Sequence, residues 1–348
     1  MTPSARPILC VSVPSPAHDL AEHPEHAGRV PAILSAVEDD GLLPELAFLG
    51  PSPLASRIQL GRCHAPSYVE GLERAMAAAP GFLDPAPTYV TPDSYRAARE
   101  AAGACIALVE ALLADPARPG LALVRPPGHH ARPGGAMGFC LLGNIALAAR
   151  AAQDRGIGRV MIVDFDVHHG NGTQEIFYAD DSVLFVSSHE SGIYPGTGFE
   201  DEIGQGPGRG TTINCPFPAL AGDRAMRECL RRIIVPAAER FRPELLLVSA
   251  GFDAHFRDPL ASLQVSGSGY HALTRGLAEL ADRHCQGRLA FVLEGGYDLE
   301  ALGNGVVNVL RALTGRPAET GLGPAPWPEP EAKVTALLDR VVARHGLD

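Results

Sequence analysis

The stretch VMIVDFDVHHGNG, residues Val160 to Gly172, begins as an interior strand and ends in a cluster of ionisable side chains. Four apolar residues are followed within a few positions by Asp164, Asp166, His168 and His169. An unpaired buried charge is costly, so such side chains at the end of an interior strand need a compensating partner. The stretch predicts a buried strand whose end carries a functional site.

Four more apolar runs end in the same way, each in a turn that contains glycine, proline or histidine. They are GLALVRPPGHH at residues 120–130, SVLFVSSHESG at 182–192, ELLLVSAGFDAH at 244–255 and RLAFVLEGGY at 288–297. The stretches between the runs are rich in alanine and leucine and predict helices over Ser94–Leu113, Asn144–Gln153, Asp223–Arg240 and Gly269–His284. Apolar strands that alternate with such helices indicate a parallel sheet covered on both faces. The predicted fold class is α/β.

The domain organisation that the sequence indicates is a single domain over residues 1–348. No repeat of fixed period occurs, and no linker is evident within residues 1–315. The remainder, residues 316–348, is a proline-rich extension that ends in helical periodicity over Glu331–Arg344. This helix is either a docking helix or an oligomer contact, and the sequence leaves both open.

The composition excludes several classes of protein. Hydrophobic residues make up 46% of the chain, and no apolar run approaches the roughly 18 residues of a membrane span. The N-terminal stretch MTPSARPILCVSV is too short and too polar for a signal peptide, and seven dispersed cysteines are typical of reduced thiols, so we expect a cytoplasmic protein. The net charge of -11 argues against binding to nucleic acid. It would suit a cationic substrate, although acidity also serves solubility alone.

The five strand ends carry ten side chains that a parallel sheet can bring together, because ligands bind at the carboxyl edge of such sheets. These side chains belong to His129, His130, Asp164, Asp166, His168, His189, Asp253, His255, Glu294 and Tyr297. Each alone is compatible with a turn or a helix cap. Their recurrence after five strands favours one shared site.

Asp166 and His168 form the centre of a predicted metal site. Side chains two residues apart in an extended segment lie on the same face, so this carboxylate and imidazole can share one cation. Asp253 is the best candidate for a third ligand. Three protein ligands with an open position are typical of catalytic zinc. A binuclear manganese site needs more carboxylates, but Gly170 and His255 stand where they would be expected, and we favour one metal.

Two further motifs supply groups for acid–base and electrostatic catalysis. RPPGHHA, Arg125–Ala131, holds His129 and His130 in a turn restricted by proline and glycine, where they can act as base and acid on a water. In LEGGY, two glycines allow the loop to approach a ligand closely, and the phenol of Tyr297 can stabilise an oxyanion. The alternatives are a pair of surface histidines and an ordinary strand-end tyrosine.

The chain resembles the arginase/deacetylase superfamily and, within it, the zinc-dependent histone deacetylase-like amidohydrolases of the class II and bacterial type. The resemblance covers residues 15–315 and rests on six motifs in the family's order: RPPGHHA, GFCLLGN, DFDVHHGNGTQEIF, YPGTG, SAGFDAHFRDPL and LEGGY. It implies a three-layer αβα domain around a mostly parallel eight-stranded sheet. It also implies a hydrolase that converts an acyl amide to an amine and a carboxylate.

The resemblance implies one zinc ion per chain, with the ligands Asp166, His168 and Asp253. It also implies a structural potassium ion near the zinc, held by Asp164, the carbonyls of Asp166, His168 and Ser188, and the hydroxyl of Ser187. A second potassium ion would be held by carbonyls around Phe177, Asp180 and Val183.

For the reaction, the resemblance implies that His129 pairs with Asp164 and that His130 pairs with Asn171. His130 would take a proton from the attacking water and later give one to the leaving amine. Zinc would polarise the acyl carbonyl, and Tyr297 would donate a hydrogen bond to the oxyanion. Class I relatives have aspartate in place of Asn171, so here the imidazole has a neutral partner.

The resemblance places the substrate channel between Phe139 and Tyr194, with the carbonyl of Gly138 accepting the substrate amide N–H. Most relatives have phenylalanine in place of Tyr194. Leu260 falls at a rim position where polyamine-preferring relatives carry glutamate, which favours acyl-lysine of proteins or peptides as substrate over an acetylpolyamine or another small amide. A non-catalytic acyl-binding protein is a third hypothesis, but no ligand, histidine or tyrosine is missing. No nucleic acid or membrane partner is expected, and an oligomer is compatible with the sequence.

Overall fold

The computed structural model describes residues 7–85, 87–116 and 118–347, so the first six residues of the N-terminal stretch considered above lie outside it. Its centre is a sheet of eight strands in the order β2-β1-β5-β10-β9-β6-β7-β8, and every neighbouring pair is parallel. The strands are β1 (Ile8–Val13), β2 (Leu46–Phe48), β5 (Gly120–Val124), β6 (Val160–Asp164), β7 (Val183–Glu190), β8 (Thr212–Phe217), β9 (Leu245–Ala250) and β10 (Leu289–Leu293). The predicted α/β fold with a mostly parallel eight-stranded sheet is confirmed.

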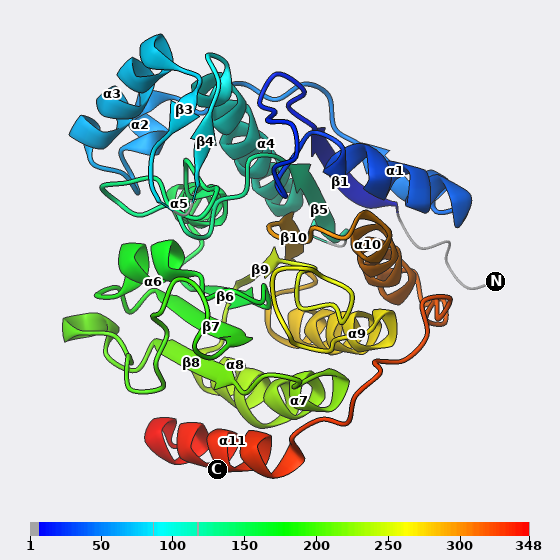
Figure 1. Cartoon of the computed structure of the whole chain (residues 1–348). Helices are drawn as coiled ribbons and strands as arrows, with labels where there is room; N and C mark the ends of the chain where they lie inside the picture. The colour runs from blue at the N-terminus through cyan, green and yellow to red at the C-terminus, as the bar shows by residue number, and fades with distance from the viewer. Residues whose placement is uncertain (1–6, 86, 117, 348) are drawn as a thin grey trace.

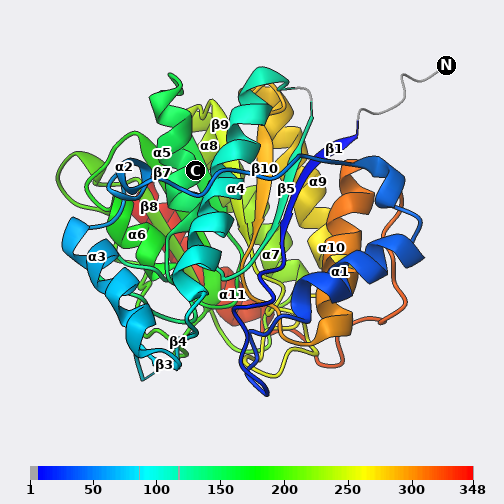
Figure 2. The same ribbon diagram turned by 90° about the horizontal axis from the view of Figure 1, so that it is seen from above.

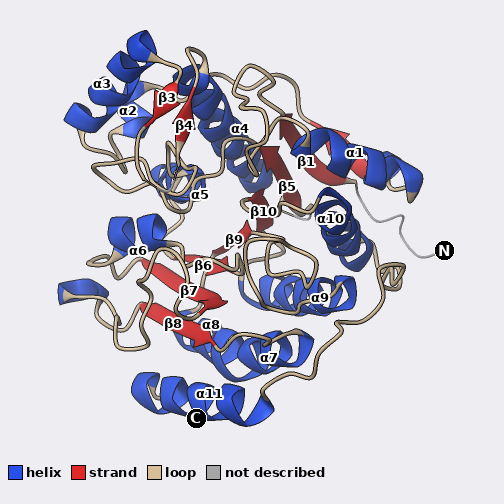
Figure 3. Cartoon of the chain, viewed as in Figure 1, coloured by secondary structure: helices blue, strands red, loops and turns tan. Residues whose placement is uncertain are grey.

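Helices cover both faces of the sheet, which gives three layers (Figures 1 and 3). One face packs against α1 (Arg29–Asp39), α7 (Asp223–Cys229), α8 (Val235–Phe241), α9 (Gly267–His284), α10 (Leu299–Leu313) and α11 (Glu331–His345). The other packs against α2 (Arg57–Leu60), α3 (Pro66–Ala75), α4 (Ser94–Ala114), α5 (Asn144–Asp154) and α6 (Asn171–Phe177). Short 3-10 turns are η1 (Leu43–Glu45), η2 (Met76–Ala78) and η3 (Gly206–Gly208), and a π turn, η4 (Leu230–Ile234), joins α7 to α8.

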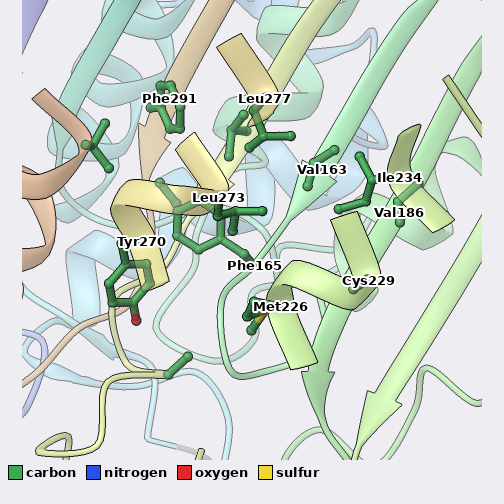
Figure 4. Packing of buried hydrophobic residues seen from close by; sticks show 14 of the residues in the cluster. Val163, Phe165, Val186, Met226, Cys229, Ile234, Tyr270, Leu273, Leu277 and Phe291 are labelled. Atoms are coloured by element: carbon green, nitrogen blue, oxygen red, sulfur yellow. The ribbon is translucent and has the colours of Figure 1, made fainter. Parts of the chain in front are cut away.

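The two hydrophobic cores follow from the alternation of side chains along each strand. In β6, Met161 and Val163 belong to one core, whereas Val160 and Ile162 belong to the other. Figure 4 shows the first core, where Phe165 packs against Tyr270 of α9 with ring centroids 5.7 Å apart. Because both faces are buried, β5, β6, β9 and β10 consist largely of apolar residues, which is the pattern that predicted the sheet.

The C-terminal extension docks on its own chain. The helix α11 packs against β8, the edge strand of the sheet, and against η4 (Figure 1). Its apolar side chains are buried there, including Val334, Leu338 and Val341. Of the two interpretations left open by the sequence, the structure contains the docking helix.

All eight strands point their carboxyl ends in the same direction, toward the lower side of Figure 2. The register places Asp164, the last residue of β6, opposite Ser187 in β7 and Ser249 in β9, and β7 continues three residues further to Glu190. The loops that follow these strands therefore all lie at the carboxyl edge of the sheet. Among the described residues, no helix is both long and apolar enough to span a membrane.

Candidate active site

Loops after five adjacent strands supply the candidate site. His129 and His130 follow β5, Tyr297 follows β10, and Asp253 follows β9. Asp164 ends β6, and Asp166 and His168 come next, while Tyr194 lies in the loop after β7. These strands stand side by side in the sheet as β5-β10-β9-β6-β7, so side chains from distant parts of the sequence meet at its carboxyl edge.

Asp166, His168 and Asp253 converge as the predicted ligand set. Nδ1 of His168 lies 3.3 Å from Oδ1 of Asp166 and 3.2 Å from Oδ2 of Asp253. Zinc bonds of about 2.0 to 2.1 Å in a tetrahedron place ligand atoms roughly 3.3 Å apart. The two separations from Nδ1 of His168 therefore fit one tetrahedral zinc ion, and all three donor atoms lie within 4.8 Å of one another.

Backbone amides hold the two carboxylates of this set in place. Oδ2 of Asp166 accepts the N–H of Gly295 at 2.8 Å, and Oδ1 of Asp253 accepts the N–H of Val167 at 2.9 Å. A Cβ atom on Gly295 would lie 2.0 Å from Oδ2 of Asp253, and one on Gly251 would lie 2.1 Å from Oδ2 of Asp166. Only glycine allows these backbone segments to approach the carboxylates so closely.

The charges of the ligand set attract a cation. Burial disfavours the imidazolium of His168, yet hydrogen bonds to Asp166 and Asp253 raise its pKa to about 10. Burial and the neighbouring Asp166 raise the pKa of Asp253. Two buried carboxylates with one imidazole between them are the donor set expected for a divalent metal, which would neutralise both acids.

The two adjacent histidines have different partners and different charges. Nδ1 of His129 lies 3.1 Å from Oδ2 of Asp164, and Nδ1 of His130 lies 2.7 Å from Oδ1 of Asn171. Burial lowers the pKa of both imidazoles, but Asp166 and Asp164 reverse this effect and raise the pKa of His129 well above 6.5. Burial and the cationic neighbours lower the pKa of His130 well below 6.5. Environments that separate two pKa values in this way are typical of acid–base sites.

The hydrogen bond to Asn171 also sets the tautomer of His130. An amide oxygen only accepts hydrogen bonds, so Nδ1 of His130 carries the proton and Nε2 is the basic atom. The amide nitrogen of Asn171 lies 3.3 Å from the sulfur of Met137, which is consistent with this orientation.

Aromatic rings surround the histidine pair. The Tyr194 ring lies edge-on to His130, with centroids 5.2 Å apart, and Phe139 lies edge-on to Tyr297 at 5.9 Å. Gly138 has a φ of +54°, and a Cβ atom there would lie 2.3 Å from Cδ2 of His130. Glycine is therefore required at the turn that presents the Phe139 ring. Leu260, at the predicted rim, is 37% exposed.

A second trio of potential metal ligands, His129, Cys140 and Glu294, lies nearby and is fully buried. Its donor atoms already have other partners. Nδ1 of His129 faces Asp164, the thiol of Cys140 donates to the carbonyl of Gly138, and Oε2 of Glu294 accepts two backbone N–H groups. We assign the metal to the first trio.

His189 and His255 do not join the group that the strand ends were expected to bring together. His189 uses Nδ1 for the hydroxyl of Ser187 and Nε2 for the carbonyl of Gly198. The ring of His255 stacks on Phe256 with centroids 4.3 Å apart, and its Nδ1 accepts the N–H of Arg257. Both histidines follow the strand pattern, but tertiary packing directs their rings to structural contacts.

Some residues of each predicted potassium site contact one another in the structure. Asp164 and Ser187 are partners in the register of β6 and β7, and the hydroxyl of Ser188 donates to the carbonyl of Asp164 at 3.4 Å. At the second site, the N–H of Asp180 donates to the carbonyl of Phe177, and Val183 begins β7. Potassium binding at either site stays a prediction.

Two acidic residues have structural roles that the sequence did not reveal. Oε2 of Glu294 accepts the N–H groups of Gly128 and His129 at 2.7 and 3.1 Å and so holds the histidine turn. Asp258 accepts the N–H of Tyr297 at 2.7 Å. Both residues lie in motifs quoted above, LEGGY and SAGFDAHFRDPL, but neither motif indicates which backbone atoms its acid contacts.

Comparison with known proteins agrees with this geometry. The histone deacetylase domain matches residues 23–313. The chain belongs to the histone deacetylase family. Members are hydrolases that remove acetyl groups, and zinc dependence is general among them.

Relatives in this family include plant and bacterial proteins. Histone deacetylase 10, chloroplastic, of Oryza sativa subsp. japonica is 44% identical over 359 residues, covering 98% of this chain and 81% of the relative. The histone deacetylase-like amidohydrolase of Pseudomonas aeruginosa is 43% identical over 280 residues, covering 80% and 72%. The crystal structure of the HDA15 HD domain matches with a TM-score of 0.88 and 33% identity, covering 98% of this chain and 94% of that one.

Proposed function

We propose that this deacetylase family member is a zinc-dependent enzyme that removes acetyl groups from N-acetyl-lysine side chains of proteins or peptides. The convergence of Asp166, His168 and Asp253 at zinc spacing, beside a neutral His130, carries the proposal. A bound zinc ion supplies Lewis-acid polarisation of the acyl carbonyl and of the attacking water.

His130 is the proposed general base. Its Nδ1 donates to Asn171, so its Nε2 accepts the proton of the attacking water. The same proton is then available for the nitrogen of the leaving amine. His129 stays charged beside Asp164 and stabilises negative charge that develops in the transition state.

Tyr297 is the proposed donor to the oxyanion. Burial and the nearby Asp253 raise its pKa well above 10, so the phenol keeps its proton at neutral pH. A preorganised donor of this kind contributes roughly a 100-fold to 1000-fold rate enhancement in acyl-transfer enzymes.

Three features support acyl-lysine as the substrate. Phe139 and Tyr194 supply aromatic walls for an alkyl chain, and the carbonyl of Gly138 is the proposed acceptor for the substrate amide N–H. The third feature is Leu260, whose exposed apolar side chain cannot pair with a distant ammonium group of a polyamine.

The test measures deacetylation of an acetyl-lysine peptide by the purified protein, before and after treatment with a chelator. We expect activity to disappear on chelation, to return with zinc, and to fall about 100-fold in Tyr297→Phe. Tyr95→Phe is the matched control, because it removes the same atom from a buried tyrosine whose charged neighbours are Arg99, Glu73 and Arg57.

A parallel assay with acetylputrescine separates the two substrate classes. Turnover more than tenfold faster on the peptide supports the proposal. Turnover more than tenfold faster on acetylputrescine would instead indicate a polyamine deacetylase. Zinc-loaded protein that hydrolyses neither substrate would contradict deacetylation of acetyl-lysine.

A further inference from the structure

Asp258 is a buried acid that joins two loops of the site. It lies in the loop after β9, between Asp253 and Leu260, and it is 7% exposed. Its Oδ1 accepts the N–H of Leu260 at 3.0 Å, and its Oδ2 accepts the N–H of Tyr297 at 2.7 Å. One carboxylate therefore links the predicted rim of the channel to the backbone of the proposed oxyanion donor.

The partners of Asp258 are backbone amides rather than a cation. Arg257, its neighbour in the chain, pairs instead with Asp298 at 3.4 Å and Glu300 at 2.8 Å. Within the described part of the chain, no cationic side chain lies at ion-pair distance from Asp258. A buried carboxylate without a cation is costly, and here the N–H groups of Leu260 and Tyr297 compensate it, with a further contribution from the N–H of Asp298.

The backbone before Tyr297 needs such an anchor. Gly295 and Gly296 precede the tyrosine and give the loop little intrinsic stiffness, and Gly296 has a φ of +122°, a conformation that favours glycine. Asp166 and Arg29 hold the two glycines, through the N–H of Gly295 and the carbonyl of Gly296. Asp258 binds the next residue, through the backbone N–H of Tyr297.

We propose that Asp258 is a positioning residue that fixes the hydroxyl of Tyr297 for catalysis. The inference rests on the proposed function, in which Tyr297 donates to the oxyanion. An oxyanion donor must lie within a few tenths of an ångström of its optimal distance, so a loop displacement at the backbone of Tyr297 weakens transition-state stabilisation.

The test is a double-mutant cycle with Asp258→Asn and Tyr297→Phe, assayed on an acetyl-lysine peptide with zinc content measured for each protein. An amide offers one acceptor oxygen, and its NH2 group would face the second N–H donor. We expect Asp258→Asn to lower kcat about tenfold or more, with KM within about twofold and one zinc per chain. In the Tyr297→Phe background, the same substitution should change kcat by less than about twofold, because the hydroxyl it positions is gone.

Asp298→Asn is the matched control. Asp298 follows Tyr297 directly, is 23% exposed, and caps α10 by accepting the N–H of Ala301, a contact that asparagine can also make. This variant should keep kcat within about twofold of the wild type, because it removes a charge beside Tyr297 without removing its anchor.

If Asp258→Asn lowers kcat by the same factor in the wild type and in Tyr297→Phe, the inference is overturned. That result would show a merely structural role of Asp258, because the effect would not depend on the Tyr297 hydroxyl. If Asp258→Asn does not fold, Asp258→Glu replaces it, with the same requirement that its effect vanish without the Tyr297 hydroxyl. A wild-type protein inert toward the peptide overturns the proposed function and this inference together. An active wild type with a multiplicative cycle overturns the inference alone.

Discussion

The amide oxygen of Asn171 lies 2.7 Å from Nδ1 of His130, so this imidazole has a neutral hydrogen-bond partner. Burial and the cationic neighbours His129 and His168 hold the pKa of His130 well below 6.5. A neutral imidazole is ready to accept a proton, which is the state that a general base requires. The pairing of His130 with Asn171 was expected from the motifs, but the pKa follows only from the packing around both rings.

Asn171→Asp should raise the pKa of this base. A carboxylate next to an imidazole shifts its pKa upward by roughly 1 to 3 units. Because the base must be neutral to act, the acid limb of the kcat/KM profile should move to higher pH by at least about one unit.

The measurement is kcat/KM on the acetyl-lysine peptide between pH 5 and 9. Asn171→Ala is the control, since it removes the hydrogen bond without adding charge and should not move the acid limb upward. An acid limb that is unchanged in Asn171→Asp would show that His130 is not the base whose titration controls the rate.

At the scale of elements, the C-terminal extension caps the N-terminus of α7, a helix about 100 positions earlier in the chain. The first turn of α7 has no cap from its own N-cap residue, Gly222. Instead, the carboxylate of Glu329 accepts the N–H groups of Gly222, Arg224 and Ala225 at 2.9, 2.7 and 2.9 Å. A negative charge is favourable at a helix N-terminus, so this contact fastens the extension to the domain.

Glu329→Gln should lower the free energy of unfolding by about 1 to 2 kcal/mol, because an amide leaves part of this N-terminus without an acceptor. Denaturant titration measures the effect. Glu331→Gln is the matched control: this side chain pairs with Arg224 at the surface, with both partners more than half exposed, and should change stability by less than about 0.5 kcal/mol. Equal losses in the two variants would contradict a capping role for Glu329.

At the scale of the whole molecule, five buried histidines make the fold sensitive to acid. Burial lowers the pKa of each from 6.5 to about 4, and they are His18, His64, His169, His255 and His345. His64 shows why a proton is excluded: Nδ1 faces the carbonyl of Arg132 at 3.0 Å, and Nε2 accepts the N–H of Gly143 at 3.0 Å. Only the neutral ring can make both contacts.

These five histidines should therefore contribute a loss in the free energy of unfolding as the pH drops from 6.5 toward 4. In this window the unfolded chain binds protons that the folded chain excludes. Each such histidine contributes a slope of up to about 1.4 kcal/mol per pH unit. His64→Gln should reduce the slope of the unfolding free energy against pH by the contribution of one histidine, up to about 1.4 kcal/mol per pH unit. Denaturant titration at several pH values measures this slope. Identical slopes for the variant and the wild type would contradict the assignment.

The sequence by itself determined the class of the fold and the position of the chemistry along the chain. Strands buried on both faces must be apolar throughout, so five of the eight could be located from their runs, with the polar residues of the site at their ends. The three missed strands are β1, β2 and β8; β2 has only three residues, and β8, with the sequence TINCPF, contains polar residues and a proline. The spacing of Asp166 and His168 likewise follows from the period of two residues in an extended chain.

Tertiary structure alone decided which side chains meet and which atoms hold them. Glu294 contacts Gly128 across 166 positions, Asp258 contacts Tyr297 across 39, and Glu329 contacts Ala225 across 104. The same packing directs the rings of His189 and His255 to structural contacts and places α11 on β8. The physical reason is that local patterns encode the periodicity of each segment, whereas these contacts depend on strand order, which places β10 between β5 and β9.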